Sequence, residues 1–172
     1  MQRLTKTYFE NNSTLFLARN LIGKTLVRVF DDETVRLKIL ETEAYIGEED
    51  LACHARNGKT ERNKVMYESG GLVYVYLIYG MYWMLNIVSA QQNQPEAILI
   101  RGIENCSGPG RVGRLLKLDK SFYAENLETS ARIWIEDSNM EGNIIATPRV
   151  GIDYAGEEWK NKPWRFIHSS AH

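Results

Sequence analysis

Apolar and polar positions alternate through much of the chain, and this alternation predicts more strands than helices. Residues 25–30 and 35–45 are each typical of a strand, and residues 31–32 favour a turn between them. Ahead of this pair, residues 12–14 can cap a short helix for which Gly23 is the stop signal. The chain is therefore expected to open with a helix followed by a β-hairpin.

The second half of the chain continues this pattern after a long loop. Residues 46–70 contain glycines and charges without a sustained period, which is typical of loop structure. Strands are expected at residues 72–78, 82–88, 97–103 and 132–136 and in the stretch before a turn at 148–151, and a further helix at 111–118. The predicted fold class is α+β. A single domain over residues 1–172 would combine an antiparallel, β-rich sheet with flanking helices.

The composition predicts one hydrophobic core but does not indicate a binding partner. With 172 residues, 44% of them hydrophobic, the chain is long enough for one substantial core. The net charge is −1, from 21 basic and 22 acidic residues, so charge alone does not predict a nucleic-acid partner. The basic residues nevertheless gather in two segments, 56–64 and 101–120. These segments form either one basic face or an ordinary solvated surface.

Cysteine usage and hydropathy bear on cofactors and location. Cys53 and Cys106 are too few and too isolated for a zinc site, which fits a reduced intracellular protein. The first residues lack the apolar core of a signal peptide, and the apolar run 72–88 is interrupted by a glycine and rich in tyrosine. We therefore expect a cytoplasmic protein without membrane contacts, metal or other cofactor.

Glu43 is the first residue that suggests chemistry. In an unbroken strand, alternate side chains share a face, and that face would carry Leu37, Ile39, Glu41, Glu43 and Tyr45. A carboxylate that follows two apolar residues on one face is expected to have a raised pKa. Glu43 is then either an ordinary surface acid or, beside the Tyr45 ring, a base that activates a water.

Tyrosines and a histidine follow within forty residues. Tyr74, Tyr76 and Tyr82 are compatible with plain strand residues, since tyrosine favours sheets. Tyr79 fits that interpretation poorly, because a bulky ring beside a glycine at a hairpin tip has little to pack against and is suited to insertion between bases. His54, in the polar loop, is either structural or a flat ring and hydrogen-bond donor for a substrate.

The segment 107–113 matches a Pro-Gly-x-x-Gly pattern that resembles the hairpin of helix-hairpin-helix DNA-binding modules. Backbone amides there could meet a phosphate at the start of a helix, but a plain turn is favoured. Patterns for zinc deaminases, phosphate-binding loops and serine nucleophile turns are absent from the sequence.

With these residues the sequence resembles the alkyladenine (3-methyladenine) DNA glycosylases, the methylpurine glycosylase family of base-excision repair. The resemblance covers nearly the whole chain, from about residue 17 to residue 166. Its most specific stretches are 41–45, 50–54, 62–63 and 74–86, with further matches at 99–101, 106–109, 120–122 and 149–151. So many matches in the same order are not expected by chance.

The resemblance implies a role for each residue around the reacting bond. Glu43 aligns with the family's general base, which deprotonates the water that attacks C1′ of a flipped nucleotide. Arg101 aligns with a residue that helps to place this water. Val150 and Gly151 align with positions that contact the nucleotide.

The aromatic residues acquire roles in the same way. Tyr45, His54 and Tyr76 align with the walls that sandwich the flipped base, and His54 also with a backbone donor to it. Tyr79 aligns with the tyrosine that fills the gap left in the duplex. Asn86 aligns with the residue that clashes with the 2-amino group of guanine.

The implied function is a DNA glycosylase of base-excision repair. It would flip 3-methyladenine or 7-methylguanine out of double-stranded DNA, with hypoxanthine and ethenoadenine as further candidates, and hydrolyse the N-glycosidic bond to leave an abasic site. Extruding a base costs a few kcal/mol, and stacking returns about 1–3 kcal/mol per base, so an aromatic sandwich with a plug roughly offsets extrusion. Because no lysine is placed as a Schiff-base nucleophile, we predict a monofunctional hydrolase without lyase activity.

Two other functions stay open. The family's fold resembles a C-terminal domain of formyltransferases that contacts RNA, so a noncatalytic nucleic-acid-binding domain is one alternative, and Glu43 counts against it. A purine nucleosidase is the other, and the protruding Tyr79 counts against that. A very short segment between Glu104 and Cys106 fits a compact bacterial-type enzyme, which we expect to be monomeric and associated with the nucleoid.

Overall fold

The computed structural model describes residues 1–31 and 33–171. Within this part of the chain nine strands join one sheet, and every pairing is antiparallel. The strands are β1 (Thr25–Phe30), β2 (Glu33–Ile46), β3 (Val73–Ile78), β4 (Tyr82–Val88), β5 (Glu96–Ile103), β6 (Cys106–Ser107), β7 (Ile133–Glu136), β8 (Ile144–Thr147) and β9 (Arg165–His168). The helices are α1 (Lys6–Glu10), α2 (Thr14–Asn20), α3 (Pro109–Leu115) and α4 (Glu157–Lys160). The predicted α+β class with an antiparallel sheet is confirmed.

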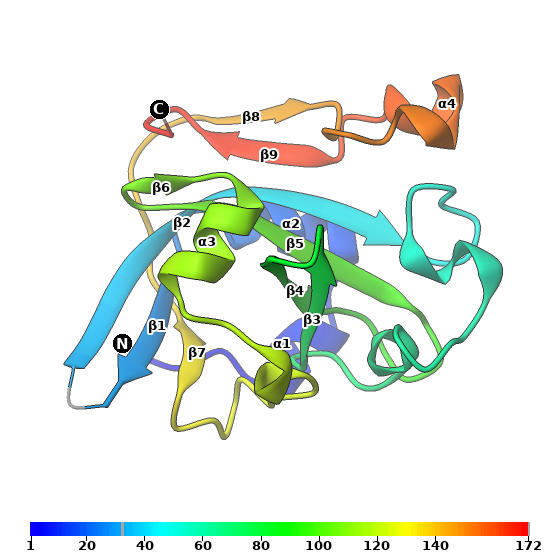
Figure 1. Cartoon of the computed structure of the whole chain (residues 1–172). Helices are drawn as coiled ribbons and strands as arrows, with labels where there is room; N and C mark the ends of the chain where they lie inside the picture. The colour runs from blue at the N-terminus through cyan, green and yellow to red at the C-terminus, as the bar shows by residue number, and fades with distance from the viewer. Residues whose placement is uncertain (32, 172) are drawn as a thin grey trace.

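The sheet is organised around the long strand β2. The main path runs β3-β4-β5-β2-β1-β7, and β9 extends the second half of β2 on its other side. Figure 1 shows α2 behind the sheet and α3 in front of it, while β8, β9 and α4 lie together along one margin. Short 3₁₀ turns at His54–Asn57 and Lys64–Tyr67 interrupt the long loop between β2 and β3.

The predicted common face of β2 is wrong because the strand is bulged. Its register against β5 shifts on both sides of Glu41. Ile39 consequently packs in the same main core as Ala44, although the two positions differ in parity, while Glu41 and Glu43 stay on the opposite face. The surroundings that desolvate Glu43 are therefore not the apolar residues that precede it on the strand.

The β3–β4 hairpin is built to present a side chain to solvent. Ile78 pairs with Tyr82, which leaves a loop of Tyr79, Gly80 and Met81. Both Tyr79 (φ +52°) and Gly80 (φ +65°) adopt the left-handed conformation, which is uncommon for an aromatic residue. Tyr79 is 84% exposed, so the ring at the tip contributes little to the core.

The glycine-rich segment at the start of α3 serves packing. A Cβ at Gly113 would lie 1.8 Å from the carbonyl oxygen of Trp83, and one at Gly110 would lie 2.8 Å from the Tyr82 ring. Gly113 thus lets α3 approach the β4 backbone closely, and Gly110 leaves room for the Tyr82 ring. The plain-turn interpretation suits this segment, and α3 occupies Pro109–Leu115 rather than residues 111–118.

Sequence patterning missed the small elements at the two ends of the chain. Helix α1 and strand β9 were not expected, and β9 takes its place beside β2 with Phe166 in the main core. Trp159 and Trp164 meet edge to face with ring centroids 5.9 Å apart, so these two aromatic residues of the tail pack against each other.

Candidate active site

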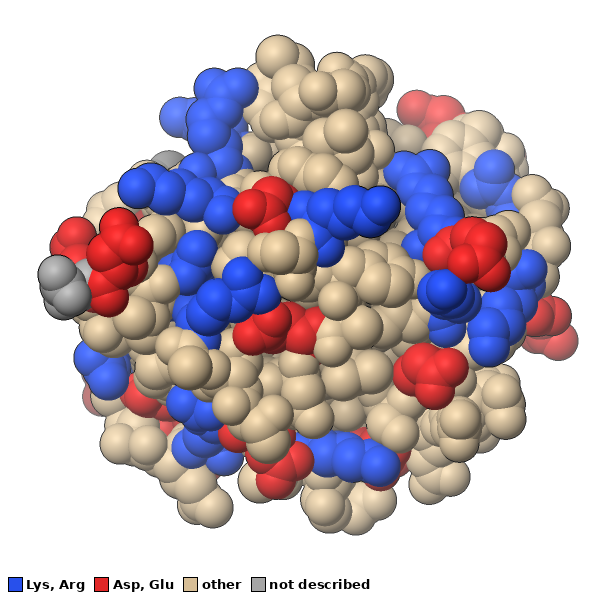
Figure 2. Space-filling view, turned by 60° about the horizontal axis from the view of Figure 1, so that its bottom comes forward, with Lys and Arg blue, Asp and Glu red and all other residues tan. Residues whose placement is uncertain are grey.

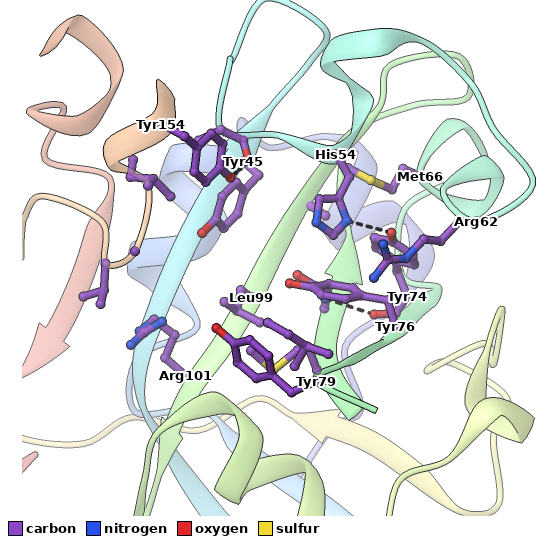
Figure 3. Close-up of a pocket in the computed structure, with 18 residues that line it drawn as sticks. Tyr45, His54, Arg62, Met66, Tyr74, Tyr76, Tyr79, Leu99, Arg101 and Tyr154 are labelled. Atoms are coloured by element: carbon purple, nitrogen blue, oxygen red, sulfur yellow. Dashed lines mark hydrogen bonds between the residues drawn. The ribbon is translucent and has the colours of Figure 1, made fainter. Parts of the chain in front are cut away.

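A pocket of about 560 Å³ opens beside the hairpin tip (Figure 3). Its lining comes from β2, β3, β4 and β5, from the loop around the two 3₁₀ turns, and from residues 150–154. The structure brings together every residue that the sequence nominated. The side chains or backbone that line the pocket belong to Tyr45, His54, Tyr76, Tyr79, Asn86, Arg101, Val150 and Gly151, and Glu43 lies directly behind Tyr45.

Aromatic rings form much of the lining. Figure 3 shows the rings of Tyr45, His54 and Tyr76 directed toward a common space. The centroids of His54 and Tyr76 are 4.4 Å apart with the ring planes at 64°. The guanidinium of Arg62 covers the Tyr76 ring at 5.1 Å from its centroid. Flat, electron-rich walls of this kind suit a planar and preferably cationic ligand.

Glu43 is fully buried behind these walls, and both of its oxygens are hydrogen-bonded. Oε1 accepts from the Val150 amide at 2.7 Å, and Oε2 accepts from the Tyr45 hydroxyl at 2.7 Å. The Arg101 Nε lies 3.5 Å from Oε1. Burial raises the pKa of Glu43 above its usual value of 4.5, and the Arg101 charge and the two hydrogen bonds pull this pKa part of the way back. A carboxylate with a raised pKa accepts a proton more readily than an ordinary glutamate does.

Glu41 holds Arg101 in place, and sequence reasoning did not identify this role. Its Oε1 accepts from Arg101 Nε at 2.9 Å and from Arg165 Nε at 2.6 Å. The side chain of Glu41 is nearly buried, so these bonds satisfy a charge that has little access to water. Glu41 and Glu43 are two positions apart on one strand, and this spacing was the available signal.

A buried ion pair joins the pocket's two loops. Arg149 donates to both carboxylate oxygens of Asp50, at 2.6 and 2.9 Å, and the side chains of both residues are 0% exposed. Arg149 also donates to the Ala44 carbonyl at 2.9 Å and lies over the Tyr45 ring at 4.8 Å. Because Val150 follows Arg149, this pair positions the amide that bonds Glu43. The partners are ninety-nine residues apart in sequence, which explains why the pairing was not foreseen.

His54 is held in its neutral form. Its Nδ1 is 2.8 Å from the Tyr74 hydroxyl, a hydrogen bond drawn in Figure 3. Desolvation, together with the charges of Arg62 and Arg56, lowers the pKa of His54 to about 4. The buried Asn86 amide donates to the Tyr74 carbonyl at 3.1 Å, so one tyrosine braces two side chains of the pocket.

The described residues offer no three-residue group of His, Cys, Asp or Glu that could hold a metal ion. None of the helices in this part of the chain has the length and apolar character that crossing a membrane requires.

Comparison with known proteins gives this site a family. The methylpurine-DNA glycosylase family matches residues 8–172. Relatives from Methanocella arvoryzae, Chlamydia felis and Borrelia garinii subsp. bavariensis are 42%, 40% and 40% identical to this chain. The alignments cover 95%, 95% and 92% of this chain and 91%, 95% and 92% of the relatives. All three are provisionally named as 3-methyladenine DNA glycosylases. The chain belongs to the methylpurine-DNA glycosylase family, and a role as a DNA glycosylase follows from this membership.

Proposed function

We propose that this chain removes alkylated purines, with 3-methyladenine and 7-methylguanine as primary substrates, from double-stranded DNA by hydrolysis. The observation that carries the proposal is the buried Glu43 carboxylate behind an aromatic pocket, with Arg101 beside it. Hypoxanthine and ethenoadenine fit the same flat walls as secondary substrates. The relatives' names agree with this substrate class.

In the proposed mechanism the damaged base enters between Tyr45, His54 and Tyr76. An N3- or N7-alkylated purine is cationic, so it stacks favourably and leaves as a neutral base. A water held near Glu43 and Arg101 attacks C1′, and Glu43 takes its proton. The C1′–N bond breaks with its electron pair going to the purine, and the new C1′–O bond yields an abasic site. Glu43 can hydrogen-bond this water beside Tyr45 because each carboxylate oxygen has a second lone pair.

Selectivity against undamaged guanine is proposed to rest on Asn86. Its amide is buried and tied to the Tyr74 carbonyl, so it cannot move aside cheaply. A purine carrying a 2-amino group would meet this amide on entry. 7-Methylguanine carries this group too, and we propose that it is accepted because its positive charge favours stacking and departure of the base. Monofunctional action is proposed as well, since no lysine lines the pocket within the described residues.

A noncatalytic nucleic-acid-binding domain is the competing proposal. Such a domain has no use for a buried carboxylate with a raised pKa, whose desolvation costs free energy. Incubation with methylated duplex DNA separates the two, because only the enzyme releases free 3-methyladenine and leaves abasic sites. DNA binding without release of any methylated base would refute the catalytic proposal.

The exposed ring of Tyr79 is proposed to fill the gap left by the extruded nucleotide. We expect Tyr79→Ala to weaken binding to duplex DNA with an abasic analogue by about 5- to 150-fold, the equivalent of about 1–3 kcal/mol of stacking. Tyr79→Phe keeps the ring and should bind nearly as well as the parent. Fluorescence anisotropy measures both, and equal affinities for the alanine and phenylalanine variants would exclude the plug.

A further inference from the structure

Two arginines stack on tyrosines of the β3–β4 hairpin, one on each strand. Arg62 lies over Tyr76 of β3 at 5.1 Å and donates to the Leu77 carbonyl at 3.1 Å. Arg114 of α3 lies over the ring of Tyr82 of β4 at 5.0 Å. Both side chains belong to exposed residues. Stacking fixes the plane of a guanidinium while leaving N–H groups at its edge free for another acceptor.

Neither arginine has an anionic partner within the described part of the chain. No carboxylate oxygen there lies within 4.0 Å of Arg62 or Arg114. The lysines that flank Arg62 in sequence differ in this respect. Lys64 pairs with Glu61 at 2.8 Å and Lys59 with Glu68 at 3.9 Å. The two stacked arginines are therefore cations held in place without a counterion among these residues.

Their position relative to the pocket is specific. Figure 3 shows Arg62 on one side of Tyr79 and helix α3, which carries Arg114, on the other. Figure 1 shows the same order, with α3 and the loop before β3 on opposite sides of the hairpin. In Figure 2, Lys and Arg side chains gather on both sides of the uncharged protrusion at the top of the view, with Asp and Glu set between them lower down.

We infer that Arg62 and Arg114 form a phosphate clamp that binds the phosphodiester groups on the two sides of the extruded nucleotide. The inference rests on the proposed function, because it takes the strand to be opened at Tyr79. A nucleotide that leaves the stack draws its two neighbouring phosphates toward the hairpin. Guanidinium groups bind phosphate through paired N–H donors, and such contacts position DNA without reading its sequence.

The clamp predicts a change in salt dependence. Affinity for duplex DNA with a tetrahydrofuran abasic analogue is measured from low to high salt. Each of Arg62→Ala and Arg114→Ala should flatten the slope of log K against log salt by about 0.9, the value for one lost phosphate contact. Arg36→Ala is the matched control, since Arg36 is also exposed but pairs with Glu136 at 3.5 Å. Parental slopes in both test variants would overturn the inference.

Neutral methylphosphonates locate each contact. With one such group placed immediately 5′ or 3′ of the analogue, one position should abolish the effect of Arg114→Ala and the other that of Arg62→Ala. Losses that simply add at both positions would contradict the clamp. Binding measurements on the parent protein distinguish a failure of the proposed function from a failure of the clamp alone. If it binds damaged and intact duplexes equally, the proposed function fails; if it prefers damaged DNA while the slopes stay unchanged, only the clamp fails.

Discussion

Glu43→Gln is expected to lower the rate of 3-methyladenine release by about 10²- to 10⁴-fold while leaving binding to damaged DNA nearly unchanged. Glutamine has the same shape, and its carbonyl oxygen can still accept from the Val150 amide at the position of Oε1. It cannot take a proton from water, however. Single-turnover release of the methylated base measures the rate, and anisotropy measures binding.

Glu136→Gln is the matched control, because Glu136 is also buried on a strand and lies on β7. It should excise at the parental rate. Full activity in Glu43→Gln would remove the carboxylate from the mechanism, whereas loss of activity in both variants would indicate a folding defect.

The pH profile is a second readout of the same carboxylate. The base must be ionised, so activity is expected to fall as pH decreases through the pKa of Glu43, which burial raises above 4.5. His54 has a pKa of about 4 and stays neutral over that limb. A cationic 3-methyladenine needs no protonation to leave, so the fall in activity at low pH should report the titration of Glu43 alone. A rate that stays flat down to pH 4.5 would contradict a raised pKa at the base.

Local sequence patterns predicted the strands and turns better than the contacts that hold the site residues in position. The strand Thr25–Phe30 and the hairpin around Tyr79 followed from alternation and turn residues, which are local properties of sequence. The β2 bulge at Glu41 did not, since an extra residue shifts the period-two pattern without leaving a mark in composition. The prediction that Leu37 and Ile39 share a strand face with Glu43 is wrong for this reason.

Pairs of polar residues that lie far apart in the sequence also could not be predicted from it. Asp50 looked like one of several acids in a loop, and Arg149 like part of a turn, until the fold placed them in contact. The clamp residue Arg114 likewise gained its meaning from the tyrosine beneath it on β4. Family resemblance supplied roles for the pocket residues, but it did not supply the contacts that hold those residues in position.

Asp50→Ala is expected to be the most destabilising single change among the residues that support the pocket, lowering the free energy of unfolding by about 3–5 kcal/mol. The substitution leaves the Arg149 guanidinium buried without its carboxylate, and Arg149 Nε already lacks a hydrogen-bond partner among the described residues. It also removes the acceptor for the amides of Ile46 and Ala52. Urea unfolding monitored by tryptophan fluorescence gives the change in free energy.

Asp153→Ala provides the comparison for this loss, because Asp153 is 91% exposed and lies 3.9 Å from Lys160. An exposed pair contributes about 0–1 kcal/mol, so this variant should unfold almost as the parent does. Combining Asp50→Ala with Arg149→Met removes both buried charges and should recover part of the stability lost in Asp50→Ala. The double variant should regain stability but not the parental rate of excision. It lacks the ion pair that positions the Val150 amide, which donates to Glu43. If Asp50→Ala lowers the free energy of unfolding by less than about 1 kcal/mol, the loop is held by packing alone. The ion pair would then have no part in positioning Glu43.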